Sequence, residues 1–516
     1  MSVLYKKYLT LCIILCMVAC SKEEVIENKN PEPFEVKVVT ITAQSASIQW
    51  NKAVTTDKIS YTIYLNETSV VANLSETTYN ITNLQPETTY NGKVVATNQN
   101  GGTTTATFSF LTPAINQEEG SLLWEKSLGG SLSDISYSVL LTNDEGCLVA
   151  GSTKSTDGDI TLNRGGQDCW LVKLNKEGTI QWQKSYGGTK QDVIHSICQA
   201  NNGGYIVGAF SSSFDNQVEA NNGMRDYWIV KLNEAGDIQW KTTVGGNKDD
   251  IVEGITATSD GGCVVAGFSS SDEIGVNGQS DAWVVKLDTD GNVEWHTHFG
   301  EAKRDLAYAI TETDDGGYMA VGATETANGT RDILVVKLNE DGNVLWSKTF
   351  GGSKNEWGNS IQKTASGEYL IGGSSDSSDG EVTDNNGSSD AWFIKLNASG
   401  NIIWTKTFGG TDSDFINEVC PTSDNGCIAV GGSRSSNADF SENHGGTDFW
   451  VVKLNAAGTI EWHKQYGGTG NDYAYSVQQD AYGNYWVSGS WYTHITGEGE
   501  SETGDDDFWV LKLKGK

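Results

Sequence analysis

The sequence predicts an all-β protein: a small β-sandwich followed by a seven-bladed β-propeller that both chain ends help to close. The strongest observation is a repeat. Seven copies of the phrase W-x-[KT]-x-[FYLV]-G, spaced 51 to 58 residues apart, begin at Trp124, Trp182, Trp240, Trp295, Trp346, Trp404 and Trp462. A fixed period of this length is typical of propellers and other repeat arrays. The 60 glycines, 5 prolines and 17 tryptophans fit short strands joined by tight turns.

Each repeat divides into four short strands. In one repeat the alternating apolar runs fall at 193–200, 204–213, 226–232 and 237–246. Period-two alternation predicts strands, and the intervening Asn, Asp and Gly residues suit turns that need a positive φ. Four antiparallel strands per repeat is the composition of a propeller blade.

The two ends of the repeat region complement each other. The chain enters this region on a fourth strand, at 121–130, and leaves it on a third strand, at 507–513. Six complete sets lie between them, and the seventh lacks only its outer strand. We therefore expect the N-terminal strand to complete the last blade, which removes the exposed sheet edges that an open array would leave. The propeller is predicted over residues 121–516, after a linker at 114–120.

A smaller domain is predicted at residues 34–113, where short alternating runs lie between turn signals. The run Leu84-Gln85-Pro86-Glu87-Thr88-Thr89-Tyr90 fits the tyrosine corner of a sandwich, in which the phenol bonds to backbone a few residues upstream. With Trp50 on an early strand, this segment resembles a fibronectin type III domain. It holds no Arg-Gly-Asp tripeptide, so the resemblance does not imply integrin-type adhesion. We expect a spacer.

The N-terminus resembles a bacterial lipoprotein signal. Lys6 and Lys7 precede an apolar stretch at 8–18, which is shorter than the ~20 residues of a membrane-spanning helix. Met17-Val18-Ala19-Cys20 resembles a lipobox, which implies a signal peptide at 1–19 and acyl chains on Cys20. The next residues, 21–24, resemble the surface-export signal of Bacteroidota lipoproteins, and 20–33 reads as a flexible tether. We expect an outer-membrane protein that faces the exterior; the alternative is an ordinary secretory signal with a chance cysteine.

The charge balance limits the classes of partner. A net charge of −32 and a pI near 4.4 argue against binding of nucleic acid or adsorption to anionic lipid, which both need a cationic surface. We expect a monomer that meets the membrane only through its lipid. Beyond Cys20, the six remaining cysteines show no metal-type spacing. A disulfide between Cys420 and Cys427, across a predicted hairpin, is left open.

The phrase V-K-L-N-x-x-G-x-[IV]-x-W, repeated in most blades, resembles the tryptophan-docking repeat of the quinoprotein propellers. It also resembles the β-propeller repeats of secreted and surface proteins of Bacteroidota. The first resemblance spans about eleven residues per blade. None of the Ca²⁺ site, aspartate base or disulfide ring of the quinoprotein enzymes can be located, so quinone redox chemistry is not inferred.

Two columns of acids recur on one face of the disc. They are Asp134, Asp192, Asp250, Asp305, Glu356, Asp414 and Asp472 before the first strands, and Asp168, Asp226, Asp281, Asp332, Asp390, Asp448 and Asp507 at the third strands. These columns are interpreted as caps of their own loops rather than as a cation ring, because short polar side chains accept backbone N–H bonds in turns. The acidic loops at 156–168 and 378–390 leave structural Ca²⁺ as an alternative, and no metal ligand is assigned.

Residues that depart from the repeat are the candidates for binding. Exposed aromatic rings beside Arg and Asp could form a glycan platform, in which rings stack on sugar C–H groups and polar neighbours bind hydroxyls. Each of these residues could instead anchor its own loop. The candidates, on loops or beside them, are Trp357, Trp491, Tyr492, Phe214, Phe440, Arg225 and Arg331.

No catalytic residue is predicted, because the six histidines are scattered and no hydrolase, metalloprotease or phosphate-binding motif is present. The sequence therefore predicts a non-enzymatic surface module that binds a glycan or a protein through the loop face of the propeller. Two alternatives remain open: a polysaccharide lyase or hydrolase on the same face, and a scaffold for envelope assembly. An enzyme would require a tight cluster of non-repeated His, Tyr, Arg or acidic residues at the channel mouth.

Overall fold

The computed structural model describes residues 29–55, 58–113, 118–276, 278–300, 303–382, 384–437, 440, 443–493 and 505–516. The predicted signal peptide at 1–19, the predicted lipidation site Cys20 and residues 20–28 of the predicted tether lie outside the described residues. The chain divides into two compact units, Met1–Gln117 and Glu118–Lys516. None of the described residues forms a helix of the length and hydropathy that a bilayer crossing requires.

The first unit is a sandwich of two antiparallel sheets. One sheet has the order β1 (Val36–Ile41), β2 (Ala46–Trp50), β5 (Thr78–Ile81), and the other has the order β4 (Thr68–Leu74), β3 (Ile59–Leu65), β6 (Thr89–Asn98), β7 (Thr103–Leu111). Their inner faces meet at Trp50 and Tyr61, whose rings pack edge to face with centroids 5.3 Å apart. The predicted tyrosine corner is present, because the Gln85 N–H donates to the Tyr90 hydroxyl over 2.8 Å.

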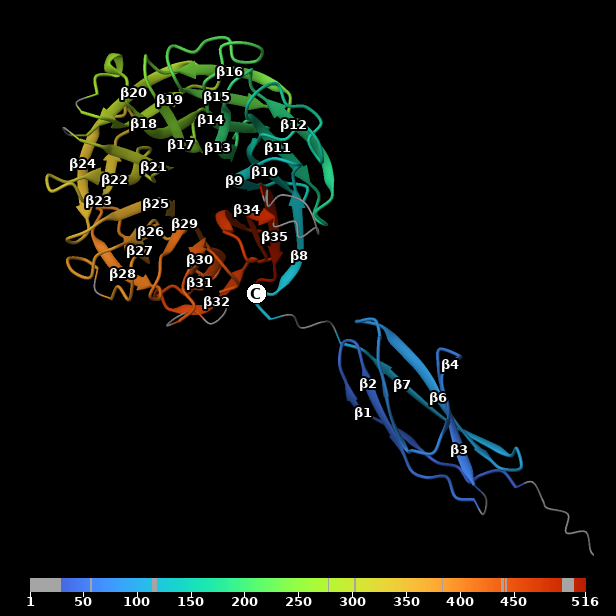
Figure 1. Ribbon diagram of the computed structural model, residues 1–516. Coiled ribbons are helices and arrows are strands. Elements are labelled where there is room, and N and C mark those ends of the chain that lie inside the picture. The colour runs from blue at the N-terminus through green and yellow to red at the C-terminus, as the bar shows by residue number, and fades with distance from the viewer. Residues whose placement is uncertain are drawn as a thin grey trace, which may run out of the picture. The chain divides into compact units, whose positions relative to one another are not determined.

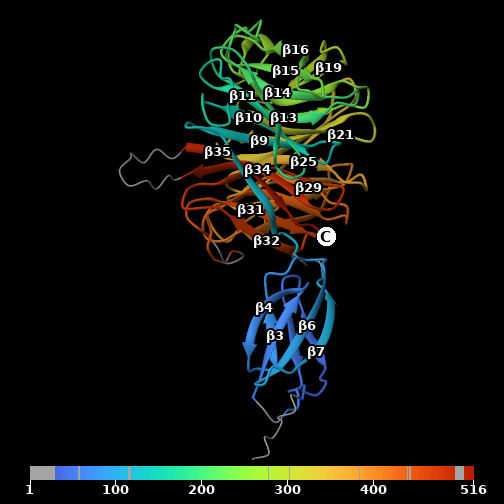
Figure 2. The ribbon, with the colours of Figure 1, turned by 90° about the vertical axis from the view of Figure 1, so that its right-hand side faces the viewer.

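The described residues of the second unit form seven four-stranded sheets arranged as a ring (Figure 1; Figure 2 shows a view turned by 90°). The inner strands are β9 (Asp134–Leu141), β13 (Asp192–Gln199), β17 (Asp250–Ala257), β21 (Asp305–Glu312), β25 (Glu356–Lys363), β29 (Asp414–Pro421) and β33 (Tyr473–Gln479). The second strands are β10 (Cys147–Thr153), β14 (Tyr205–Ser211), β18 (Cys263–Ser269), β22 (Tyr318–Glu325), β26 (Tyr369–Ser375), β30 (Cys427–Ser433) and β34 (Tyr485–Thr493).

The third and outer strands complete the blades. The third strands are β11 (Asp168–Leu174), β15 (Asp226–Leu232), β19 (Asp281–Leu287), β23 (Arg331–Leu338), β27 (Asp390–Leu396), β31 (Asp448–Leu454) and β35 (Asp505–Leu513). The outer strands are β12 (Ile180–Tyr186), β16 (Ile238–Val244), β20 (Val293–Phe299), β24 (Val344–Phe350), β28 (Ile402–Phe408), β32 (Ile460–Tyr466) and β8 (Leu122–Leu128). One short 3₁₀ helix, η1 (Asp272–Ile274), lies in the loop after β18.

Both chain ends build the last blade, as the sequence predicts. Strand β8 pairs antiparallel with β35, in a register that runs from Phe508 opposite Leu128 to Leu513 opposite Leu122. The all-β prediction, a sandwich plus a seven-bladed propeller closed by N- and C-terminal strands, is confirmed.

The repeated tryptophans join neighbouring blades. Gly236, in the last turn of its blade, has φ +77°, and a Cβ there would lie 2.9 Å from the ring of Trp182 in the preceding blade. The same contact closes the ring, because a Cβ on Gly178 of the first blade would lie 3.1 Å from the ring of Trp124 on β8 of the last blade. Glycine is required at these turns both for the positive φ and for the close approach of the indole.

The acid columns act as loop caps. Asp192 is fully buried, and its Oδ2 accepts the Gly188 N–H at 2.7 Å and the Ser213 hydroxyl at 2.8 Å. The two columns meet at the Gly-Gly turns, since a Cβ on Gly245 would lie 2.5 Å from Asp226 and 2.8 Å from Asp250. Burial, with the nearby Asp250 charge, raises the pKa of Asp226 to about 6.

Two local features refine the sequence predictions. Trp491 and Tyr492 lie in the last part of β34, which continues through Thr493, and not in the loop that follows it. Cys427 lies opposite Pro421 rather than opposite Cys420, so the two thiols are offset by one residue. Both are free, as are the other cysteines in the described part of the chain.

Candidate functional site

Every inner strand carries a β-bulge at one position. Strand pairing skips a single residue, three places after the acid column, as between Ile194 and Ser196 in β13. Bulges of this kind redirect a side chain and are common beside functional sites. The seven skipped residues, called the channel ring below, are Tyr137, His195, Glu253, Tyr308, Asn359, Asn417 and Tyr475.

The channel ring lines a cavity to which all seven inner strands contribute. Its volume is about 130 Å³. Since a water molecule occupies about 30 Å³ in the liquid, this space holds a few waters or one small polar group. The inner strands surround the centre of the disc (Figure 1), so the cavity lies on the propeller axis.

An aromatic arc covers part of the channel wall. The ring centroid of Tyr137 lies 5.2 Å from that of Tyr475 and 4.9 Å from that of His195, with which it stacks. His195 Nδ1 is 2.9 Å from Glu253 Oε2. Burial raises the pKa of Tyr137 and of Tyr308 to about 12, so both phenols keep their protons at neutral pH. The arc thus combines hydroxyls, an imidazole and a carboxylate within one wall.

The two asparagines of the channel ring are fixed by the neighbouring blade. Asn359 Nδ2 donates to the Ile416 carbonyl, and Asn417 Nδ2 donates to the Ala474 carbonyl, both at 2.8 Å. These bonds hold the amides in one orientation. Five blades therefore present aromatic, imidazole or acidic groups to the channel and two present amides.

Two of the predicted candidates meet beside the channel. The Arg331 guanidinium lies 6.0 Å from the ring centroid of Trp357, which is half-buried. Trp357 follows the acid column directly and is two residues before Asn359 in β25. Arg225 occupies the equivalent place in another blade, where it binds Asp249 and lies over Phe210.

Phe440 is not an exposed platform residue. It is only 3% exposed, and its ring packs against Trp450 and His463, with centroids 4.9 and 5.9 Å away. The prediction of Phe440 as a binding residue is therefore wrong, because the loop uses this ring as a hydrophobic anchor.

The other aromatic candidates are placed apart from one another. Phe214 is 62% exposed, and the Lys190 ammonium lies 4.4 Å from its ring centroid. Trp491 packs against Trp509 with centroids 5.1 Å apart. The Tyr492 N–H donates to the acid-column residue Asp472 over 3.0 Å. His494 lies outside the described residues.

The channel ring itself was not predicted from the sequence. A signal is present, since the position three residues after the acid column holds Tyr, His, Glu or Asn inside an otherwise apolar strand. An alternating pattern predicts which face of the strand each side chain occupies only while the pairing is regular. The bulge adds one unpaired residue, so the pattern does not predict where its side chain points.

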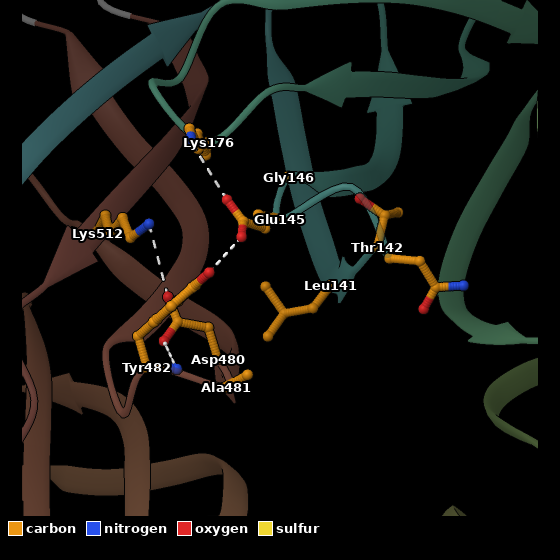
Figure 3. Close-up of a pocket in the computed structure, with 10 residues that line it drawn as sticks. Leu141, Thr142, Glu145, Gly146, Lys176, Asp480, Ala481, Tyr482 and Lys512 are labelled. Carbon is orange, nitrogen blue, oxygen red and sulfur yellow. Dashed lines mark hydrogen bonds and ion pairs between the residues drawn. The ribbon is translucent and has the colours of Figure 1, made fainter.

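A second pocket, of about 360 Å³, lies where the inner strand β9 ends, at the end opposite to the acid columns (Figure 3). Glu145 binds Lys176 at 3.2 Å and the Tyr482 hydroxyl, while Asp480 lies 3.6 Å from Lys512. The charged groups of this pocket are thus paired within their own blades, and the Tyr482 hydroxyl joins the last blade to Glu145 of the first.

The acidic loops use their carboxylates in turns. Asp157 accepts the Ser131 N–H at 2.8 Å, and Asp379 accepts the Ser353 N–H at 2.7 Å. Within the described ranges, no group of three or more His, Cys, Asp or Glu residues is arranged to hold a metal ion. Structural Ca²⁺ stays a prediction.

Comparison with known proteins gives similarities to both units. Residues 31–111 match the fibronectin type III domain family. The regulatory protein FlaEY of Caulobacter vibrioides is 24% identical over 401 residues, which cover 68% of this chain and 42% of that protein. Among solved structures, the WD40 domain of Neurospora crassa Pan2 has a TM-score of 0.43 at 10% identity, with 76% of this chain and 96% of that chain covered. Sqt1 of Chaetomium thermophilum has a TM-score of 0.40 at 11% identity, with 77% and 100% covered.

Proposed function

We propose that this chain is a non-enzymatic, outer-membrane-anchored surface lipoprotein that binds a glycan through the loop face of its propeller, at the mouth of the central channel. The fibronectin type III domain acts as a spacer between the lipid anchor and the propeller. A protein partner on the same face is the alternative occupant.

One observation carries this proposal: the blades repeat their scaffold residues but differ in the channel ring. The acid column is Asp in six of seven blades, whereas the channel ring holds four residue types. A scaffold needs the same residue in every blade, while recognition of an asymmetric ligand needs differences among blades.

A glycan-array screen of the full chain in detergent tests the proposal. We expect binding to a restricted set of glycans, with loss in Trp357→Ala and no change in Phe440→Leu, because Phe440 is buried away from the face. Repeating the screen with a chelator tests the predicted calcium loops. Absence of binding to every glycan, combined with capture of a purified envelope protein, would replace the glycan with the protein partner.

Membrane anchoring needs its own test. Metabolic labelling with palmitate is expected to mark the wild-type chain and not Cys20→Ala, and external protease is expected to cleave the chain on intact cells. Labelling of Cys20→Ala would contradict the lipoprotein assignment.

The channel ring also supports a second candidate function, an enzyme acting on polysaccharides. A histidine bonded to a carboxylate is an arrangement used in general base catalysis, and Tyr137 supplies a protonated phenol close to it. His195, Glu253 and Tyr137 support this candidate because they bring a non-repeated His, acid and Tyr together in the channel wall. Release of reducing ends from a bound polysaccharide, abolished in His195→Ala, would favour the enzyme. Binding without turnover would favour the binding module.

A further inference from the structure

Two arginines beside the channel have no carboxylate partner in the described part of the chain. Arg304 directly precedes β21 and Arg331 begins β23. Both belong to one blade, where the Glu325 N–H donates to the Arg304 carbonyl at 2.8 Å and Glu325 lies opposite Arg331 in strand register. Both charges also lower the pKa of the nearby Tyr308, although burial raises it more. Two carboxylates close to these arginines are engaged elsewhere: Glu325 is 3.4 Å from Lys303, and Asp376 accepts from Asn355 at 3.2 Å.

Comparison of two blades shows that this lack of a partner is a local feature. Arg225 and Arg331 both stand directly before the Asp of a third strand. Arg225 donates through Nε and Nη2 to the two carboxylate oxygens of Asp249, at 2.8 and 2.9 Å. The position equivalent to Asp249 beside Arg331 holds the neutral Asn355. Its side-chain oxygen accepts the backbone N–H of Arg331 at 3.2 Å.

A carboxylate thus neutralises the guanidinium of Arg225, whereas the equivalent position beside Arg331 supplies a neutral amide. This is unexpected in a chain with 67 acidic and 35 basic residues, where carboxylates are abundant. A planar guanidinium recognises carboxylate and sulfate groups through paired N–H donors. An open arginine pair is therefore suited to an anion.

Trp357 adds a planar apolar surface to this corner. The equivalent residues in the other blades are Ile135, Val193, Ile251, Leu306, Phe415 and Tyr473, so the indole is particular to this blade. It is half-buried and lies beside Arg331. Arg304, Tyr308, Arg331 and Trp357 are called the Arg–Trp corner below.

We propose that the Arg–Trp corner binds an acidic sugar residue, with Arg304 and Arg331 on its carboxylate or sulfate group and Trp357 against its ring. This inference rests on the proposed glycan-binding function and specifies the ligand class. The protein as a whole is strongly acidic and repels polyanions at long range. Recognition therefore depends on short-range contacts at the corner rather than on electrostatic steering.

Titration calorimetry with the full chain in detergent tests the assignment with three probes: trigalacturonate, neutral trigalactose and a sulfated galactose trimer. We expect the wild-type chain to bind an anionic trimer and to bind trigalactose at least about tenfold more weakly, the scale of one lost charged contact. Arg331→Met and Trp357→Ala are each expected to lose about tenfold or more in affinity for the anionic trimer.

A matched pair of variants separates recognition from folding. Asn355→Asp places beside Arg331 the carboxylate that Arg225 already has, so it should abolish anionic binding without removing any side chain of the corner. Arg225→Met removes an equivalent arginine from a neutralised site and should leave affinity within about twofold. Thermal unfolding of each variant reports whether the fold is retained.

The outcomes distinguish this inference from the proposed function. Preference for the sulfated trimer supports the corner and identifies a sulfate ester as the anion, whereas preference for trigalacturonate identifies a carboxylate. Equal binding of neutral and anionic trimers, or full binding by folded Asn355→Asp, overturns the corner and leaves glycan binding standing. Absence of binding to these trimers and to every glycan on the array overturns both.

Discussion

At the residue scale, Glu418 illustrates how one blade departs from the shared design. In two other blades, a serine next to the channel ring accepts a backbone N–H of the neighbouring blade, as Ser476 does from Val139 at 3.0 Å and Ser360 from Val419 at 3.3 Å. Glu418 performs this role in its blade, accepting the Val477 N–H at 2.7 Å. Burial raises the pKa of Glu418 to about 7. An ionisable group thus replaces a neutral acceptor in the wall of the channel.

We predict that Glu418→Gln stabilises the protein at alkaline pH. The folded pKa lies above the value of about 4.3 in unfolded chains, so the native state holds a proton that the unfolded state releases. The contribution of Glu418 to the free energy of unfolding is therefore greatest below about pH 4. It declines as the pH rises to about 7. Gln keeps the acceptor and does not titrate.

The expected gain for Glu418→Gln is about 1–3 kcal/mol at pH 8, shrinking toward zero near pH 4. Urea unfolding at several pH values between 4 and 8 measures this difference. A gain that stays constant with pH would show that the titration of Glu418 does not contribute.

At the scale of the elements, the contact between each outer-strand tryptophan and the next blade holds the ring together. The Trp240 indole N–H also donates to the Thr289 carbonyl of the following blade at 3.0 Å. The turn at Gly236 accepts a similar approach from Trp182, and the Tyr186 hydroxyl donates to the Gly236 carbonyl at 2.7 Å. Each junction therefore depends on a glycine with positive φ under an aromatic ring.

We predict that Gly236→Ala destabilises the propeller more than Gly203→Ala does. Gly203 also has a positive φ, of +89°, but a Cβ there meets nothing within 4 Å. Both variants incur about 1–2 kcal/mol for the left-handed conformation. Gly236→Ala should lose roughly 1–3 kcal/mol more, because its Cβ collides with Trp182 in a packed junction. The two free energies of unfolding in urea measure the difference, and equal values would show that docking at this turn tolerates a methyl group.

The elements also show where the sequence was sufficient and where it was not. Strand alternation and the tryptophan period predicted the blades and the role of β8, because both patterns follow from which face of a strand is buried. The tyrosine corner was predicted from a local motif, the run from Leu84 to Tyr90, because the phenol bonds to backbone only five residues upstream. The channel ring was missed because a bulge breaks the alternation at His195 and its equivalents. Phe440 was misassigned because a loop sequence does not indicate whether an aromatic ring turns inward.

At the scale of the whole molecule, many buried carboxyl groups are held in the two acid columns. Burial raises the pKa of Asp168, Asp226 and Asp472 to about 6 and that of Asp507 to about 7. Hydrogen bonding from Lys337 acts in the opposite sense on Asp315, whose pKa falls to about 2. Carboxyl groups with a raised pKa change the free energy of unfolding between about pH 4 and pH 7. Carboxyl groups with a lowered pKa, such as Asp315, lose their contribution to that free energy only in stronger acid.

We predict that the protein is most stable in mildly acidic solution. Between the unfolded pKa of about 3.9 and the folded values near 6 to 7, the native state binds more protons than the unfolded chain, so the free energy of unfolding falls as the pH rises. Approach to the pI of about 4.4 also reduces the self-repulsion of a net charge of −32. Tm should therefore peak near about pH 5 and decline toward pH 8.

Calorimetry at low and high salt separates the two causes. Salt screens repulsion between exposed charges but affects buried carboxyl groups much less. We therefore expect high salt to reduce the decline in Tm between pH 5 and pH 8 but not to abolish it. The decline that remains in high salt should be smaller in Asp507→Asn, because Asn cannot ionise. A Tm that is constant or rises between pH 5 and pH 8 in high salt would mean that the buried carboxyl groups of the acid columns do not govern the pH dependence of stability.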